Sequence, residues 1–414
     1  MKVLFSGDIF SNFGSRTTFR SGIFFVAYAL LKEFCAMDDI TVTIYSSYSK
    51  KNKVEQFLSN SRLNIKTISV RPLPNRQLQK WLNAYNEKRD SKGLKPVKGT
   101  RRLREANESL DQRLARWDMR RFRDYDVFFS PCEAAPPAVE ETGMPIYTII
   151  HDLIPIVTGE FAVRKGYWLY DVLKQVSPEK YYFCISECTR RDFLQYCPKA
   201  KPEHVRVFYN GFEPKGDTIT ETEAAEIIRK AGLAWKRYIL ILGNVVPHKN
   251  VARQMKAGIQ FIKESGMPDF RIAIVGSCKH PEEFLDGAGI PDDDRRLITF
   301  SGYVPDEHIQ AYYRGAFCLS FTSLYEGFGL PALEAMEEGC PVVTSNTSSL
   351  PEVVGDAAIC IPPEDTDAHV EAYMNLYRNP ELREDLIVRG RERVKMFRWE
   401  HTAQQMIDGM KNDR

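Results

Sequence analysis

The sequence lacks any apolar run long enough to cross a membrane. About 20 consecutive apolar residues are needed to span a bilayer as a helix, and no run in this chain approaches that length. Residues 1–7, MKVLFSG, are also too short and too quickly polar to form a signal peptide. We therefore expect them to form a buried first strand that ends in a glycine turn.

The nine cysteines lack the spacing of a disulfide framework or a zinc site. None of them forms a C-x-x-C pair, their number is odd, and several, such as Cys318, lie in short apolar runs. This usage is typical of reduced thiols in the core of a cytosolic enzyme. We therefore predict a cytoplasmic protein.

The signals for two further kinds of site are absent or weak. Gly7 is not followed by the other glycines of the dinucleotide-binding fingerprint, so NAD binding is not predicted. The acidic pairs Asp292-x-Asp294 and Asp365-x-Asp367 could be read as metal ligands, but both lie in acidic, loop-like stretches away from a suitable strand. We therefore predict no metal site and no metal cofactor.

The formal net charge of +2 hides one strongly basic segment. Between residues 71 and 124, Lys and Arg outnumber Asp and Glu by 16 to 7. Residues 76–123 are predicted to form a basic helical insert, which is either a solvated excursion or a surface for anionic lipid headgroups or a polyanionic acceptor. Nucleic acid is not favoured as a partner, because no known binding module accompanies the charge. The second alternative would place the protein peripherally on the inner face of the cell membrane.

The chain has enough apolar mass for two α/β domains. Its 414 residues are 43% hydrophobic and 27% charged, and short apolar runs alternate with helix-like stretches, as in parallel α/β architecture. A turn cluster at residues 211–217 separates two sets of strands, so we predict domains at residues 1–212 and 217–395. The predicted strands are residues 3–6, 41–46, 126–130, 146–150, 181–185, 238–242, 271–275, 297–300, 317–321 and 342–344.

The most informative segment is residues 322–336, TSLYEGFGLPALEAM, between a buried strand and a helix. Gly327 and Gly329 allow a tight turn and close approach of the backbone to a ligand. Pro331 is expected at the first position of the helix and Glu334 in its first turn. The free N–H groups of the helix start suit an anion such as a diphosphate. Glu326 and Glu334 would then accept hydrogen bonds from hydroxyl groups of sugar and ribose.

Two further strand ends carry candidate residues. Residues 239–250, ILILGNVVPHKN, place His248 and Lys249 after a strand and glycine turn, where a lysine point charge suits a departing diphosphate. Residues 148–155, TIIHDLIP, place His151 at the carboxyl end of a strand, which is the edge where open α/β sheets bind ligands.

Together these segments resemble the group-four family of retaining GT-B glycosyltransferases, which assemble bacterial glycans and glycolipids. The spacing Glu326-x7-Glu334 is similar to the family's glutamate motif, and residues 151–155 are similar to its HDLIP segment. Residues 247–250 resemble its P-R-K-N loop, with His248 replacing the usual arginine. The resemblance implies an α/β fold of two Rossmann-like domains facing across a cleft. It assigns the acceptor to the first domain and the donor nucleotide to the second, with residues 396–414 forming a helix that returns to the first.

The resemblance also implies a role for each candidate residue. His151, Glu326 and Lys249 would be catalytic, with the first two orienting the donor sugar and Lys249 gripping its phosphates. Gly22 lies in an N-terminal loop that departs from the family's Gly-Gly-Ile, and Val304 lies in the segment that presents backbone groups to the base. The implied donor-binding set is His248, Lys249, Gly22, Val304, Glu326, Gly327, Phe328, Gly329, Leu330 and Glu334.

The implied activity is transfer of a hexosyl group from a nucleoside-diphosphate sugar to a hydroxyl of a glycan or lipid-linked glycan, with retained configuration. A GDP-sugar donor is slightly favoured, since the segments look closest to mannosyl-transferring members, and no metal cofactor is expected. Cell-surface polysaccharide synthesis is the expected process. The alternatives are a sugar-nucleotide epimerase or glycan phosphorylase on the same fold, and a non-catalytic partner subunit of a glycosyltransferase.

Overall fold

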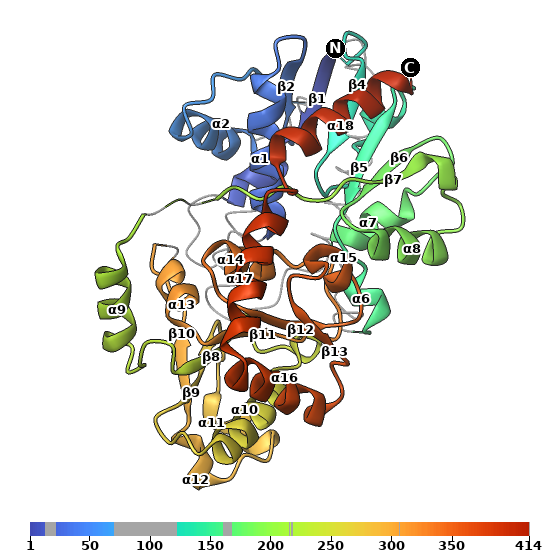
Figure 1. Cartoon of the computed structure of the whole chain (residues 1–414). Helices are drawn as coiled ribbons and strands as arrows, with labels where there is room; N and C mark the ends of the chain where they lie inside the picture. Colours follow the sequence, from blue (N-terminus) through green and yellow to red (C-terminus); the bar gives the residue numbers. More distant parts are fainter. Residues whose placement is uncertain are drawn as a thin grey trace, which may run out of the picture.

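A computed structural model describes residues 1–12, 22–69, 122–159, 168–214, 216, 218–305 and 307–413. These residues form two parallel β-sheets, one at each end of the molecule, with helices packed around them (Figure 1). Buried apolar residues fill the sheets, as is usual for parallel strands covered on both faces. Within these ranges no helix combines the length and apolarity needed to cross a bilayer.

The first sheet has the strand order β3-β2-β1-β4-β5-β6-β7, and all its pairs are parallel. Its strands are β1 (Lys2–Ser6), β2 (Thr41–Tyr45), β3 (Thr67–Ile68), β4 (Val127–Ser130), β5 (Ile146–Ile150), β6 (Tyr181–Cys184) and β7 (Val205–Val207). The helices of this half are η1 (Asp8–Asn12), α1 (Gly22–Ala36), α2 (Lys51–Asn60), α5 (Pro137–Glu140), α6 (Ile154–Val157), α7 (Trp168–Lys174), α8 (Glu187–Tyr196) and η3 (Pro202–His204).

The second sheet has the strand order β10-β9-β8-β11-β12-β13 and is also parallel throughout. Its strands are β8 (Tyr238–Leu242), β9 (Arg271–Val275), β10 (Ile298–Gly302), β11 (Cys318–Phe321), β12 (Val342–Ser345) and β13 (Ile359–Ile361). The helices that accompany it are α9 (Glu221–Lys230), η4 (Pro247–Lys249), α10 (Val251–Ser265), α11 (Pro281–Gly287), α12 (Asp292–Arg295), α13 (Ile309–Gly315), α14 (Leu330–Glu337), α15 (Leu350–Val354), α16 (Thr366–Arg378) and α17 (Pro380–Val394).

Each strand predicted from the sequence is present, with ends that differ by at most two residues. The strands that the prediction missed are β3, β7 and β13, which are two or three residues long and lie at the outer edges of the sheets. Such short segments have no hydrophobic period of their own, and pairing with a neighbour defines them. The predicted α/β fold is confirmed.

The last helix, α18 (Trp399–Asn412), lies against the first half of the molecule beside α1 (Figure 1). Lys411 Nζ lies 2.6 Å from the Asp39 carboxylate, and Tyr147 Oη donates to Asp413 at 3.1 Å. The chain therefore passes between the two halves twice. The two crossing segments meet where Phe212 N–H donates to the carbonyl of Phe397 at 2.9 Å. The domain limits 212, 217 and 395 stay predictions.

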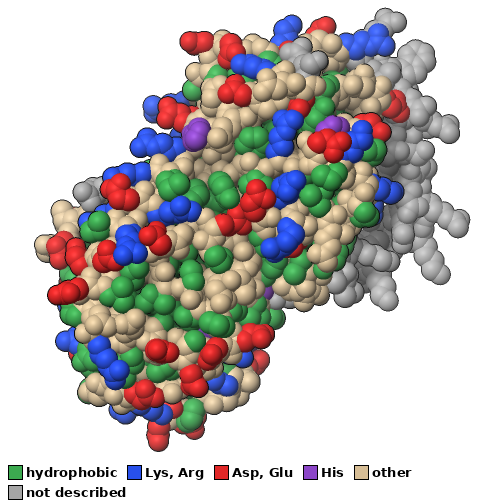
Figure 2. Space-filling view, turned by 45° about the vertical axis from the view of Figure 1, so that its right-hand side comes forward, with side chains coloured by type: hydrophobic (Ala, Val, Ile, Leu, Met, Phe, Trp, Pro, Cys, Tyr) green, Lys and Arg blue, Asp and Glu red, His purple; other side chains and the backbone are tan. Residues whose placement is uncertain are grey.

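The basic insert predicted at residues 76–123 lies almost wholly outside the described residues. On the face shown in Figure 2, Lys and Arg side chains are interspersed with Asp and Glu side chains among the coloured residues. The role of the basic segment therefore stays a prediction from the sequence.

Candidate active site

The strand order of the second sheet reverses between β8 and β11, so the loops after these two strands diverge and leave a crevice at the carboxyl edge. Lys249 ends η4 in the loop after β8, and Glu326 lies in the loop after β11. Lys249 Nζ is 2.6 Å from Glu326 Oε1. The two residues that the sequence predicted to share a donor site are therefore in direct contact.

The backbone of Glu326 is held by a neighbouring loop. Ser349 Oγ donates to the carbonyls of Glu326 at 2.9 Å and Phe328 at 2.8 Å, and Ser348 Oγ accepts from the N–H of Glu326 at 3.2 Å. Ser345 Oγ adds a bond to the carbonyl of Ser323 at 2.5 Å. This anchoring by serines was not predicted. Its sequence signal is the cluster of hydroxyl residues directly after β12.

Lys249 is fixed by the residue that follows it. Asn250 adopts a left-handed conformation, with φ of 56°, and is the N-cap of α10. Its amide nitrogen donates to the carbonyls of Thr322 at 3.1 Å and Pro363 at 2.6 Å. Asparagine tolerates this conformation better than most residues, and its side chain ties the lysine loop to the end of β11. These bonds hold the loop in the position from which the Lys249 ammonium contacts Glu326.

His151 lies at the end of β5 in the first sheet and is 3% exposed. Its Nε2 is 2.6 Å from the carbonyl oxygen of Pro131. Because a carbonyl only accepts, Nε2 must carry the hydrogen. Burial lowers the pKa of His151 to about 4, so the ring is neutral at physiological pH. The remaining nitrogen, Nδ1, is therefore a hydrogen-bond acceptor, which suits a sugar hydroxyl.

The two halves touch directly at Gly327. A Cβ atom at this position would lie 2.3 Å from the carbonyl oxygen of His151, and Ser186 Oγ donates to the carbonyl of Gly327 at 2.9 Å. The expectation was that glycine admits a ligand here. The structure instead shows the backbone of the first half occupying that space, so the absence of a side chain allows the two carboxyl edges to meet.

The start of α14 differs from the prediction by one residue. The helix begins at Leu330, with Gly329 (φ of 121°) as its N-cap, so Pro331 is the second helical residue and not the first. Glu334 is then the fifth residue, about 6 Å along the axis from the start, and not part of the first turn. Its carboxylate accepts from Tyr313 Oη at 2.7 Å. That hydroxyl orients the carboxylate.

Asp152 is a site residue that the sequence analysis did not single out. The net shift of its pKa is upward, because burial, aided by the nearby charge of Glu326, outweighs the opposing effects. Those opposing effects come from the N–H of Ile154 and the charges of His248 and Lys249. A Cβ atom at Gly327 would lie 2.9 Å from the Cβ of Asp152, so Asp152 lies beside the loop that carries Glu326. Its sequence signal was its position directly after His151 at a strand end.

Four further residues were predicted to bind the donor, and the structure places each of them as follows. His248 is buried, and its carbonyl accepts from Leu324 N–H at 2.7 Å. The Phe328 ring packs against Phe397, 5.7 Å between centroids, so only its backbone can serve a donor. Val304 follows β10, two strands from β8, and Gly22 begins α1 after β1, two strands from β5. The donor-binding roles of these two residues stay predictions.

The acidic pairs considered as metal ligands have other contacts. Asp365 caps α16 by accepting from the N–H of Ala368 at 3.0 Å. Asp294 pairs with Lys263 at 2.8 Å, and Asp292 pairs with Arg295 at 3.0 Å. Within the described ranges, no group of three or more His, Cys, Asp and Glu side chains is placed to hold a metal ion.

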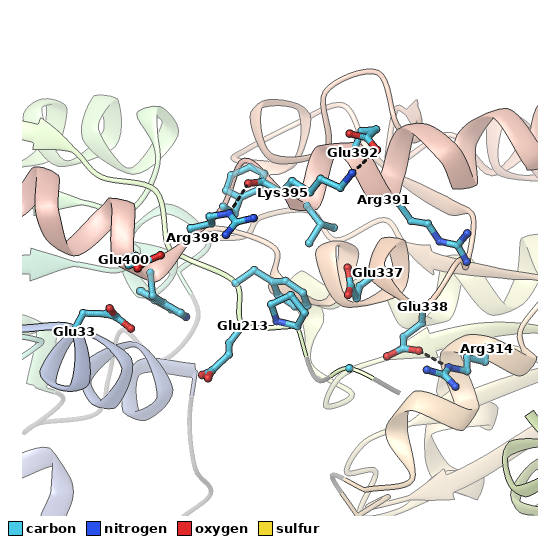
Figure 3. Close-up of a pocket in the computed structure, with 16 residues that line it drawn as sticks. Glu33, Glu213, Arg314, Glu337, Glu338, Arg391, Glu392, Lys395, Arg398 and Glu400 are labelled. Atoms are coloured by element: carbon cyan, nitrogen blue, oxygen red, sulfur yellow. Dashed lines mark hydrogen bonds and ion pairs between the residues drawn. The ribbon is translucent and has the colours of Figure 1, made fainter. Parts of the chain in front are cut away.

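A cavity of about 770 Å³ lies where the two crossing segments meet (Figure 3), and neither Lys249 nor Glu326 is among its lining residues. Two of its basic groups are already paired, Arg314 with Glu338 and Lys395 with Glu392, each at 2.5 Å. Carboxylates outnumber cations in its lining, so it does not suit a diphosphate. Its charged residues are Glu33, Glu213, Arg314, Glu337, Glu338, Arg391, Glu392, Lys395, Arg398 and Glu400.

Comparison with known proteins identifies similar sequences. Residues 224–393 match the family model described as glycosyl transferases group 1. Over 313 residues the chain is 29% identical to O-antigen chain mannosyltransferase B of Escherichia coli, covering 75% of this chain and 80% of that protein. Over 182 residues it is 31% identical to the MMP alpha-(1->4)-mannosyltransferase of Mycolicibacterium hassiacum, covering 43% of each.

Solved structures with the same fold include the Anabaena protein HepE in complex with UDP and glucose. It superposes with a TM-score of 0.66 at 15% identity, over the whole of both chains. Sucrose-phosphate synthase of Thermosynechococcus elongatus gives a TM-score of 0.63 at 17% identity, covering 100% of this chain and 98% of that one. At such identities the likeness concerns the fold, which agrees with the two Rossmann-like halves described above.

Proposed function

Because this chain is a glycosyltransferase of the GT-B fold and belongs to the group-four family, we propose that it transfers a hexosyl group from a nucleoside-diphosphate sugar to a hydroxyl of a glycan or lipid-linked glycan. The transfer would retain the anomeric configuration and serve cell-surface polysaccharide synthesis. The named process of the Escherichia coli relative, O-antigen chain synthesis, supports this assignment.

The contact between Lys249 and Glu326 carries the proposal. It lies at the switch point of the second sheet and opposite His151 of the first. The ammonium would stabilise the negative charge that grows on the departing diphosphate, and the N–H groups at the start of α14 would add to it. Without a donor, Glu326 neutralises Lys249. A bound diphosphate would compete for the ammonium and release the carboxylate to a sugar hydroxyl.

His151 would orient the donor sugar from the other side. Its neutral ring offers Nδ1 as an acceptor, and the Pro131 carbonyl fixes the ring plane through Nε2. We propose no protein nucleophile. The leaving diphosphate would help to deprotonate the acceptor on the same face of the sugar, and most of the acceleration would come from positioning and preorganised charge. Lys249 and the helix start would supply the positive charge, so we propose a reaction that is independent of metal.

Mannose is the proposed sugar, carried by GDP. Both sequence relatives described above are named mannosyltransferases, and the HDLIP and PHKN segments look similar to those of mannosyl-transferring members. Donor hydrolysis across GDP-, UDP-, dTDP- and ADP-sugars, with and without EDTA, tests the donor. Hydrolysis of GDP-mannose that persists in EDTA is expected.

The same screen separates the alternative functions. Conversion of the donor to an epimer without an acceptor would identify an epimerase, and a requirement for inorganic phosphate in place of a nucleotide would identify a phosphorylase. A non-catalytic partner subunit need bind none of these nucleotides in isothermal titration. Failure to bind or turn over any nucleotide sugar would contradict the proposed function.

We also propose a cytoplasmic protein whose basic segment at residues 76–123 binds the anionic inner face of the cell membrane. Each Lys or Arg near such a surface contributes about 1 kcal/mol. Co-sedimentation should be stronger with anionic vesicles than with neutral vesicles. Equal binding to both would remove this part of the proposal.

A further inference from the structure

The first sheet has a switch point of its own, which the proposed function leaves unused. β1 pairs with β2 on one side and with β4 on the other, so the strand order reverses between β1 and β4. Ligands of open α/β sheets bind in the crevice at such a point. In the second sheet this position holds Lys249 and Glu326. In the first it holds another lysine with two carboxylates.

These three groups are Lys50, Asp8 and Glu133. Lys50 Nζ lies 3.4 Å from Asp8 Oδ2 and 3.9 Å from Glu133 Oε1. Both distances exceed the 2.7–3.2 Å of an ordinary N–H···O hydrogen bond. The ammonium therefore stands between two carboxylates without a close bond to either, and a hydroxyl oxygen could bridge the groups.

Among the residues that the structure describes, hydrogen bonds hold one oxygen of each carboxylate. Asp8 Oδ1 accepts from Ser46 Oγ at 2.9 Å and from the N–H of Ser47 at 2.7 Å. Glu133 Oε2 accepts from Ser6 Oγ at 2.9 Å. The other oxygen of each group, Oδ2 or Oε1, is the one directed at the lysine. Two anchored carboxylates thus present one oxygen each to the same space.

This arrangement is poorly explained as a device for stability. Burial, followed by the charge of Asp8, raises the pKa of Glu133 to about 7, although Lys50 and the Ser6 hydroxyl lower it. A second carboxylate beside one ammonium carries an electrostatic cost that a simple ion pair would avoid. The Glu133 side chain is also 24% exposed, so a ligand can reach it. Perturbed charged groups in such a position are typical of functional sites.

The cluster is also connected to the reaction centre. Pro131, whose carbonyl fixes His151, lies two residues before Glu133 in the turn after β4. Ser130 closes this turn, because its Oγ donates to the carbonyl of Glu133 at 2.6 Å and accepts from its N–H at 2.8 Å. Neighbouring strands are about 4.8 Å apart, and β5, which His151 directly follows, is next to β4. A sugar ring bound beside Glu133 would therefore lie next to the sugar that His151 orients.

From this geometry we propose that Lys50, Asp8 and Glu133 form the subsite for the acceptor, and that the acceptor unit bound there is a neutral, hydroxyl-rich sugar. The two free carboxylate oxygens would accept from sugar hydroxyls, and Lys50 would donate to a third oxygen. With two acidic groups against one cation, the subsite disfavours a phosphorylated sugar. This inference rests on the proposed transferase function and extends it to the first sheet.

The test compares acceptor use in wild-type protein and in the variants Glu133→Gln and Asp8→Asn. The neutral acceptor is the best substrate among the methyl glycosides of mannose, glucose, galactose and N-acetylglucosamine. The charged acceptor is mannose 6-phosphate. Each variant should lower kcat/KM for the neutral acceptor at least 10-fold, mainly through KM, while donor affinity measured by calorimetry changes less than twofold. Glu55→Gln, an exposed carboxylate on α2 paired with Lys51, is the matched control.

The outcomes separate this inference from the function on which it rests. If the wild type neither binds nor turns over any nucleotide sugar, the proposed transferase function itself fails. If it transfers sugar but both variants keep acceptor kcat/KM within twofold, or if it prefers mannose 6-phosphate, the acceptor subsite is wrong. Thermal melting of both variants checks that they fold. Because Asp8 and Glu133 lie on different elements, the inference can still be tested if one of the two variants does not fold.

Discussion

The two sheets use the same topological position for different charges. At the switch point of the second sheet one lysine meets one carboxylate at 2.6 Å, beside a helix start. At the switch point of the first sheet one lysine stands 3.4 Å and 3.9 Å from two carboxylates. At the second site Lys249 is in direct contact with one carboxylate, Glu326, with Asp152 nearby, and the start of α14 adds positive potential, which suits an anion. The first has surplus negative charge, which suits neutral hydroxyls. Topology thus places a site, and the side chains decide the ligand.

The largest effect is expected from breaking the second site. Lys249→Ala and Glu326→Ala should each lower turnover about 10²-fold or more, because each removes a preorganised contact to the reacting sugar phosphate. Steady-state kinetics on the true substrates measures this. Lys263→Ala, which removes a lysine of α10 paired with Asp294, should stay close to wild type. Wild-type turnover in either site variant would refute the assignment.

The second largest effect is expected in the pH dependence of the free energy of unfolding, to which His151 contributes. Its pKa is lowered from 6.5 to about 4 by burial, so its contribution to the free energy of unfolding is complete above pH 6.5 and is lost as the pH falls toward 4. This contribution is about 3 kcal/mol. Urea unfolding at pH 6.5 and pH 4.5 should show a smaller loss in His151→Gln than in the wild type. Equal losses would show that the ring is accessible to protons in the folded state.

Breaking the contact between the two halves is expected to change the free energy of unfolding by a similar or smaller amount. In Gly327→Ala the added methyl group would meet the His151 carbonyl at 2.3 Å, so the two edges must separate. Overpacking of this kind costs about 1–3 kcal/mol, and turnover should fall with it. Gly287→Ala, at the end of α11, places its methyl group in open space and serves as the control. A Gly327→Ala protein as stable and active as the control would mean that the contact is dispensable.

The smallest effect is expected from titrating the first site. Acceptor kcat/KM should rise a few-fold as the pH increases through about 7, where Glu133 ionises, and should be flatter in Glu133→Gln. The groups around this carboxylate include Asp8 on η1, Lys50 before α2, Tyr45 on β2, the Ser6 hydroxyl on β1 and the Cys132 thiol. Its raised pKa means that folding favours the protonated form, so stability is lost as the pH rises from 4.5 toward 7. Glu133→Gln should therefore melt higher relative to the wild type at pH 8 than at pH 5.

How far the fold could be predicted varies with the length of the element. The β8 and β9 strands matched their predicted residues, because four or five apolar residues in a row bounded by turns have few alternatives. The β3 strand did not, since two residues carry no pattern and exist as a strand only through pairing with β2. Helix starts were less certain. The position of Pro331 suggested a start one residue later than the Leu330 that the structure shows.

The sequence by itself determined the parallel α/β class and the identity of the groups at the strand ends, because hydrophobic periodicity and loop chemistry are local properties. Lys249, Glu326 and His151 could therefore be named in advance. Only the tertiary structure decided that Gly327 serves contact between the halves, that Tyr313 holds Glu334, and that Asp8 and Glu133 share Lys50. These contacts join residues far apart in the chain, and the order of strands in a sheet, which creates them, leaves no local signal.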